Sequence, residues 1–188
     1  MRIVEDLSLT GSSLKTKVNL YKKRAKIIEE YLLKNPNEWG KFQNEFNAEI
    51  NSVFRDIMNF EKKCLANDEE GKLYKLKQLF INKIRGPFER GEYIKWVLKK
   101  PYGYAGDFKY IEDIYENNPK TIGFDRLFDN YTMMSAISIA VRNRKNDFKR
   151  MITEYVSARQ NCALRIMDLA SGPCREIYEI FIENKHQY

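Results

Sequence analysis

Apolar residues recur every three or four positions through much of the chain, which is the spacing that places them on one face of an α-helix. The most regular series runs through residues 42–64 and consists of Phe42, Phe46, Ile50, Val53, Ile57, Phe60 and Cys64. A stripe of this kind packs against a neighbouring antiparallel helix. The series therefore predicts a core helix, and its three phenylalanines leave a hydrophobic groove for a ligand as the alternative.

Weaker series with the same spacing flank this helix. One, capped by Ser12 or Ser13, ends at the Asn-Pro-Asn sequence of residues 35–37. Two more run through residues 73–84 and 93–98 and are separated by a Gly-Pro pair. Together these series predict a mainly α fold that begins as a helical bundle.

The connector at residues 101–107 differs from the other turns because it combines two glycines with two tyrosines, Tyr102 and Tyr104. Glycine permits positive φ, and tyrosine offers a ring with a hydroxyl tip. Asp107 is placed to cap a helix over residues 108–117. The simplest interpretation is a turn between helices whose tyrosines cover the edge of the core.

The second half of the chain continues with a short helix around residues 124–128 and a long one from about Thr132 to Ala158. The apolar stripe of the long helix consists of Met134, Ile137, Val141, Phe148, Ile152 and Tyr155. At 100° per residue, Arg144 lies near the middle of this stripe, whereas Arg142 points roughly the other way and is predicted to be a surface residue.

An arginine on an apolar face needs an acidic partner if it is buried. Arg144 therefore either pairs with a carboxylate from a neighbouring helix, such as Asp107 or Asp125, or binds the carboxylate of a ligand.

The sequence near the end of the chain has the pattern of a strand, a tight turn and a helix. Residues 164–169 form a short and mostly apolar run, which suits a buried strand. The small residues Ala170, Ser171 and Gly172 follow, and Pro173 is tolerated in the first turn of a helix. This unit places backbone N–H groups and a positive dipole end beside a nucleotide-like ligand.

Residues 168–175, Asp-Leu-Ala-Ser-Gly-Pro-Cys-Arg, resemble the first motif of class I S-adenosyl-L-methionine-dependent methyltransferases. Residues 100–108 and 140–144 resemble a bacterial group of these enzymes that is labelled as fatty-acid (3-hydroxy acid) methyl ester biosynthesis proteins. The resemblance covers roughly residues 95–183. Cys174 stands where many members of the family carry a third glycine, so we expect a slightly less open turn.

The resemblance implies a helical N-terminal cap domain over residues 1–160 and the first β-α unit of a Rossmann-like domain over residues 161–188. It implies S-adenosyl-L-methionine as the cofactor and a small-molecule carboxylate or fatty-acid-like acceptor. The implied cofactor-binding residues are Asp168, Ala170, Ser171, Gly172, Tyr104 as part of an aromatic lid, and Arg144 as the partner of a carboxylate. No residue is identified as a catalytic base.

Only 14 residues follow Cys174, whereas the acidic residue that holds the ribose comes about 20 residues after the glycine turn. We therefore expect an incomplete, truncated Rossmann-like domain that is inactive as a lone chain. The missing part would come from a longer protein, from a C-terminal half in trans or from a second copy in a homodimer. The alternative function is a helical binding and assembly module, in which the residual strand serves only to pair with a partner.

Composition narrows the remaining possibilities. The net charge of +7 arises from 33 basic residues spread among 26 acidic ones, which favours a solvated surface over a nucleic-acid interface. Three distant cysteines and one histidine argue against a zinc site and a disulfide framework, and thus predict a reducing, cytoplasmic setting. No apolar run is long enough to predict a transmembrane segment. The first residues lack the apolar core of a signal peptide.

Overall fold

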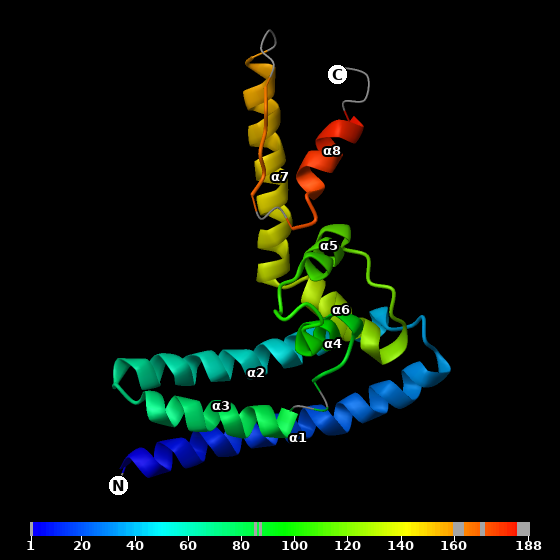
Figure 1. Cartoon of the computed structure of the whole chain (residues 1–188). Helices are drawn as coiled ribbons and strands as arrows, with labels where there is room; N and C mark the ends of the chain where they lie inside the picture. Colours follow the sequence, from blue (N-terminus) through cyan, green and yellow to red (C-terminus); the bar gives the residue numbers. More distant parts are fainter. Residues whose placement is uncertain (1, 85, 87, 160–163, 170–171, 184–188) are drawn as a thin grey trace. The chain divides into compact units, whose positions relative to one another are not determined.

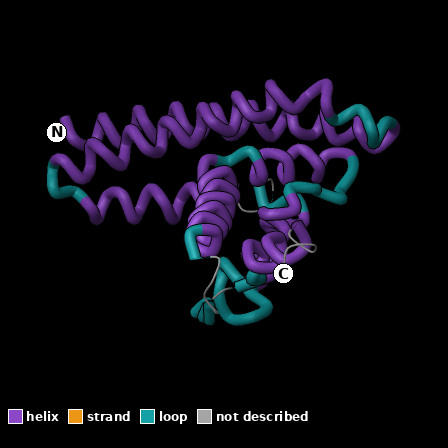
Figure 2. The backbone as a smooth tube through the Cα atoms, turned by 90° about the horizontal axis from the view of Figure 1, so that it is seen from above, coloured by secondary structure: helices purple, strands orange, loops and turns teal. Residues whose placement is uncertain are grey.

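The computed structural model describes residues 2–84, 86, 88–159, 164–169 and 172–183 (Figure 1). Within these residues all regular structure is helical, and Figure 2 shows only helices and loops. The elements are α1 (Arg2–Lys34), α2 (Gly40–Ala66), α3 (Glu70–Ile84), α4 (Glu92–Lys99), α5 (Phe108–Glu116), α6 (Gly123–Met133), α7 (Ala136–Ser157) and α8 (Arg175–Glu183). The prediction of a mainly α fold is confirmed.

The helices form two compact units. The first contains Met1–Gly91 and Thr121–Phe128, and the second contains Glu92–Lys120 and Asp129–Tyr188. The division passes through α6, and α8 packs against α7 inside the second unit. These units do not follow the predicted division near residue 160, which stays a prediction about a larger Rossmann-like domain.

In the first unit, α2 packs against both α1 and α3 with the stripe that the sequence predicts. The buried members of this stripe are Phe46, Ile50, Val53, Phe60 and Cys64. Phe46 is 1% exposed and meets the ring of Phe128 edge-on, with a centroid distance of 4.8 Å. The prediction of a core helix is thus confirmed, because these side chains are enclosed by other apolar groups.

Two helices begin at other residues than the sequence predicts. α1 starts at Arg2 and runs through Gly11, because a single internal glycine costs a helix only about 1 kcal/mol. α7 starts at Ala136 instead of about Thr132, because α6 extends to Met133 and Ser135 caps the next helix. The Ser138 N–H donates to Ser135 Oγ at 3.3 Å.

Two fully buried carboxylates fix the start of α4 and α5 in the second unit. Asp129 accepts hydrogen bonds from the backbone N–H groups of Glu92 and Tyr93 at 3.1 and 3.2 Å. Asp107 accepts the backbone N–H of Tyr110 at 2.9 Å, which confirms the predicted cap, and the Nε1–H of Trp96 at 2.8 Å. Each helix start thereby receives an acceptor for its otherwise unpaired N–H groups.

Arg142 is not the surface residue that the helical projection predicts. It is half-buried and donates to the backbone carbonyls of Met133 at 2.8 Å and Ile114 at 3.5 Å. These carbonyls belong to the last turns of α6 and α5, where backbone acceptors lack partners within the helix. The projection fails because both partners come from other helices.

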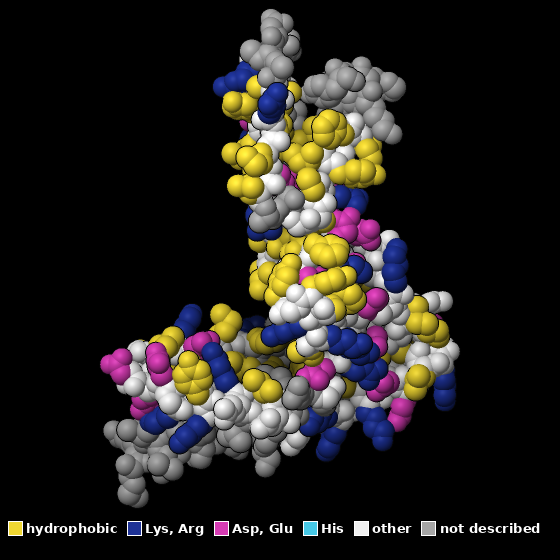
Figure 3. Space-filling model, in the orientation of Figure 1, with side chains coloured by type: hydrophobic (Ala, Val, Ile, Leu, Met, Phe, Trp, Pro, Cys, Tyr) yellow, Lys and Arg dark blue, Asp and Glu magenta, His cyan; other side chains and the backbone are white. Residues whose placement is uncertain are grey.

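The apolar stripe of α7 is largely open to solvent. Val141 packs against the core around Ile114 and Met133, but Ile137, Phe148 and Tyr155 are exposed. Figure 3 shows apolar side chains over α7 and over α8. In the described part of the chain, no helix combines the length and apolar character needed to cross a membrane.

Replacing Asp107 by alanine should lower the free energy of unfolding by about 2–4 kcal/mol, because the cap is lost and the Trp96 N–H loses its acceptor. Urea unfolding measures this change. Glu116→Ala, at the exposed end of the same helix, is the matched control and should stay within about 0.5 kcal/mol of the parent chain. Equal stability of the two variants would contradict the role of Asp107.

Candidate functional site

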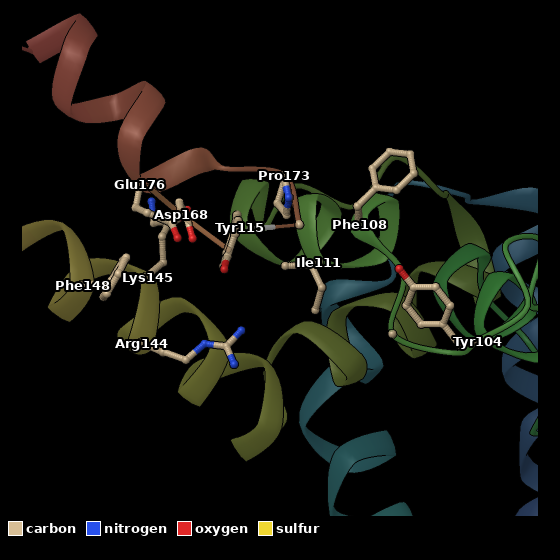
Figure 4. Close-up of a pocket in the computed structure, with 12 residues that line it drawn as sticks. Tyr104, Phe108, Ile111, Tyr115, Arg144, Lys145, Phe148, Asp168, Pro173 and Glu176 are labelled. Atoms are coloured by element: carbon tan, nitrogen blue, oxygen red, sulfur yellow. The ribbon is translucent and has the colours of Figure 1, made fainter. Parts of the chain in front are cut away.

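One cavity of about 540 Å³ lies within the second unit, in the size range of small-molecule sites (Figure 4). Its walls come from the loop before α5, from α5, from the middle of α7, and from the turn that leads into α8. Segments that lie up to about 70 residues apart in sequence therefore meet around one volume (residues 104 to 176).

The structure brings together the predicted site residues that it describes. Tyr104, Arg144, Asp168 and Gly172 all line this cavity. Ala170 and Ser171 lie outside the described residues. The four residues come from three segments that the sequence alone could not place side by side.

The predicted strand is not formed. Residues 164–168 are irregular and residue 169 is in a turn. The segment has no backbone–backbone hydrogen bond to other described residues. Ile166, Met167 and Leu169 are exposed, Met167 by 80%. A strand is stable only beside another strand, and the described residues contain no other strand with which this segment could pair.

The turn into α8 has the backbone conformation of a glycine-rich loop. Gly172 has φ +59° and Cys174 has φ +52°, which is the left-handed region that L side chains rarely adopt. Cys174 therefore takes a glycine-like conformation, at the position where the motif that residues 168–175 resemble often has a third glycine. Its Sγ lies 3.8 Å from an Asp168 side-chain oxygen, and α8 begins directly after it, so Pro173 precedes the helix instead of lying in its first turn.

Arg144 does not pair with either carboxylate that the sequence suggests. Asp107 is occupied by Trp96 and the start of α5, and Asp125 pairs with Arg90 at 2.6 Å. Arg144 is exposed, lines the cavity and has no ion-pair partner among the described residues. Figure 4 shows its guanidinium extending from α7 toward the side of the cavity that Ile111 lines.

The two tyrosines of the 101–107 loop have separate roles. Tyr102 leans on the ring of Phe108 at 5.0 Å and on Trp96 at 6.3 Å, so it covers the edge of the core. Tyr104 is half exposed and lines the cavity. In Figure 4 it stands at the opposite end of the cavity from Asp168. Gly103, at φ +87°, makes the reversal between them possible.

Sequence reasoning missed Glu176, the second residue of α8. Glu176 lines the cavity, is only 9% exposed, and its Oε2 has no hydrogen-bond partner among the described residues. The available signal was its position directly after the glycine turn, at a helix N-terminus where carboxylates are favoured. Its burial could not be inferred from that position.

Ion pairs hold α8 against α7 and α5 beside the cavity. Glu179 accepts from Lys145 at 2.5 Å and from Arg175 at 3.2 Å, and Arg175 also binds Glu112. Burial works to raise the pKa of Glu179, but the hydrogen bonds and charges of Lys145, Arg175 and Lys149 outweigh it. The pKa of this carboxyl therefore lies below its ordinary value.

No family model, curated protein or solved structure matches the chain. Across the described residues, no group of three or more metal-binding side chains is gathered. The functional interpretation therefore depends on the geometry of the cavity and on the residues that line it.

Gly172→Ala should lower the free energy of unfolding by about 1 kcal/mol through backbone strain alone, since open space surrounds the added Cβ. Cys174→Gly should leave stability unchanged or raise it by up to about 1 kcal/mol, because it relieves the same strain. Thermal unfolding of the two variants and of the parent chain measures these changes. A stability loss of more than about 1 kcal/mol in Cys174→Gly would contradict the assigned turn.

Because of Glu179, the free energy of unfolding should decrease at acidic pH. A carboxyl with a lowered folded pKa contributes stability that is complete above its unfolded pKa, about 4.3, and is lost as the pH falls through the folded value. Urea unfolding at pH 7 and at pH 3 should show a smaller acid loss in Glu179→Gln than in the parent chain. Glu154→Gln, in an exposed pair on α7, should behave like the parent. An unchanged acid loss in Glu179→Gln would refute the assignment.

Proposed function

We propose that this chain is the N-terminal part of an S-adenosyl-L-methionine-dependent methyltransferase and that the cavity is part of its cofactor site. One observation carries the proposal: the described residues picked out by the family resemblance line one cavity, although they come from three distant segments. They are Tyr104, Arg144, Asp168 and Gly172. A chance resemblance gives no reason for such convergence.

The chemistry of the cavity fits the cofactor. The guanidinium of Arg144, which has no ion-pair partner among the described residues, suits a carboxylate, and the carboxylates of Asp168 and Glu176 suit an ammonium group. The rings of Tyr104 and Tyr115 suit a sulfonium, because aromatic faces attract cations. When bound, the cofactor supplies an electrophilic methyl group.

The residues of this chain would act by binding and orientation. Arg144 would fix one end of the ligand, Tyr104 and Phe108 would limit the access of water, and Gly172 would let the backbone approach closely. A carboxylate or fatty-acid-like acceptor is already ionised near neutral pH and needs no base to remove a proton. The absence of an identified base is therefore compatible with this acceptor class.

The unpaired segment at residues 164–168 indicates how such a site would be completed. As the first strand of a Rossmann-like sheet, it would pair with strands from polypeptide outside the described residues, in the same protein, in a partner chain or in a second copy. That pairing would also cover Met167 and Leu169, which are now exposed. Without these additional strands, we expect no methyl transfer.

The second candidate function is a helical assembly module. The observation that favours it is the amount of apolar surface on α7, on residues 164–169 and on α8. In this case the same surface would bind a partner, and the cavity would have no cofactor role.

Calorimetry with S-adenosyl-L-methionine separates the two functions. The enzyme proposal predicts no measurable heat with the chain alone and clear heat when a candidate C-terminal half is added. In the mixture, Arg144→Gln should weaken binding about tenfold, because a charge-assisted pair is lost. Arg150→Gln, on the same helix but outside the cavity, is the matched control. Absence of heat in a mixture that does form a complex would leave the assembly module.

A further inference from the structure

Glu176 is a buried residue with one carboxylate oxygen that lacks a partner in the described part of the chain. It is 9% exposed, and its Oε2 has no hydrogen-bond partner among the described residues. A buried charge without a partner is costly, so such groups are normally paired or bound to a ligand. Glu176 also lines the cavity, so a bound molecule can contact its side chain.

The neighbouring cations are committed to other carboxylates. Lys145, which shares the cavity wall with Glu176, pairs with Glu179 at 2.5 Å. Arg175, the preceding residue, binds Glu112 and Glu179. Glu112 also has one oxygen without a partner, but the guanidinium of Arg175 balances its charge. Among the described residues, no cationic side chain forms an ion pair with Glu176.

The helix N-terminus does not account for this arrangement by itself. An acidic residue in the first turn of α8 interacts favourably with the helix dipole whether it is buried or exposed. An exposed position would give this benefit without the cost of desolvation. The cavity beside Glu176 has room for a ligand group that would supply the missing partner. A metal ion is disfavoured, since no cluster of three ligating side chains exists among the described residues.

We propose that Glu176 contacts the ligand directly and accepts a hydrogen bond from an ammonium group, while Arg144 in the same cavity binds a carboxylate of the same molecule. The ligand class is then a zwitterion: an α-amino acid, or a larger compound that carries one. This inference rests on the proposed function in that S-adenosyl-L-methionine belongs to this class, and it assigns the recognition of its amino-acid end to a named pair of side chains.

NMR titration of the full chain tests the assignment, because it detects binding that is too weak for calorimetry. The probes are S-adenosyl-L-methionine, L-methionine and 5′-methylthioadenosine, which lacks the amino-acid group. The first two should shift the backbone amide signals of Glu176, Gly172 and Arg144. Glu176→Gln should weaken both about tenfold, as expected for the loss of a hydrogen bond to a charged group, and should not alter 5′-methylthioadenosine binding.

The matched control is Glu183→Gln, which removes a carboxylate from α8 outside the cavity and should leave all three affinities unchanged. A second readout separates ligand contact from a structural role. Without ligand, Glu176→Gln should unfold at an equal or higher urea concentration than the parent chain, because removing a buried carboxylate with an unpaired oxygen offsets the lost interaction with the helix dipole. A lower midpoint would overturn the inference.

The remaining outcomes distinguish the inference from the proposed function. Unchanged binding of both amino-acid probes to Glu176→Gln, or no shift of the cavity amides by either probe, overturns the inference. If S-adenosyl-L-methionine binds and Glu176→Gln has no effect, the proposed function stands without it. If L-methionine binds through Glu176 and S-adenosyl-L-methionine does not bind, the inference stands and the proposed function fails.

Discussion

The second unit of this protein depends on two buried carboxylates that satisfy the backbone at helix starts. Asp129 reaches the first N–H groups of α4, and Asp107 caps α5 while holding the indole N–H of Trp96. Since an unpaired buried N–H is costly, these bonds leave the two helices little freedom to start elsewhere. The bonds of Asp107 also fix the end of the 101–107 loop, whose Tyr104 lines the cavity.

A feature of this structure could be predicted from the sequence when the residues that form it lie close together along the chain. The Asp107 cap could be predicted because its acceptor and donor lie three residues apart, whereas the Asp129 bonds join residues 36 and 37 positions apart and leave no periodic signal. The stripe of α2 was predictable because regular spacing encodes one buried face. The same method failed for Arg142, whose carbonyl partners lie on two other helices, and for the stripe of α7, most of which is exposed.

The candidate site shows a similar limit. The resemblance selected Tyr104, Arg144, Asp168 and Gly172, but only the fold brings them to one cavity. Glu176 escaped notice because burial without a partner is a tertiary property that a residue type does not reveal. The strand predicted at residues 164–169 depends on hydrogen bonds to neighbouring strands. An apolar run can indicate such a strand, but the segment cannot form it without a neighbour. Both proposed functions allow such pairing, and only cofactor binding separates a methyltransferase from an assembly module.

The central claim is that this cavity receives the methyl donor, and photolabelling tests it most directly. Ultraviolet irradiation of the chain with S-adenosyl-L-methionine radiolabelled in its methyl group, followed by peptide mapping, locates the contact. The account predicts label in the peptides that contain Tyr104 or residues 168–176, suppressed by excess S-adenosylhomocysteine. Label confined to α1–α3, or label that the competitor does not reduce, would contradict it.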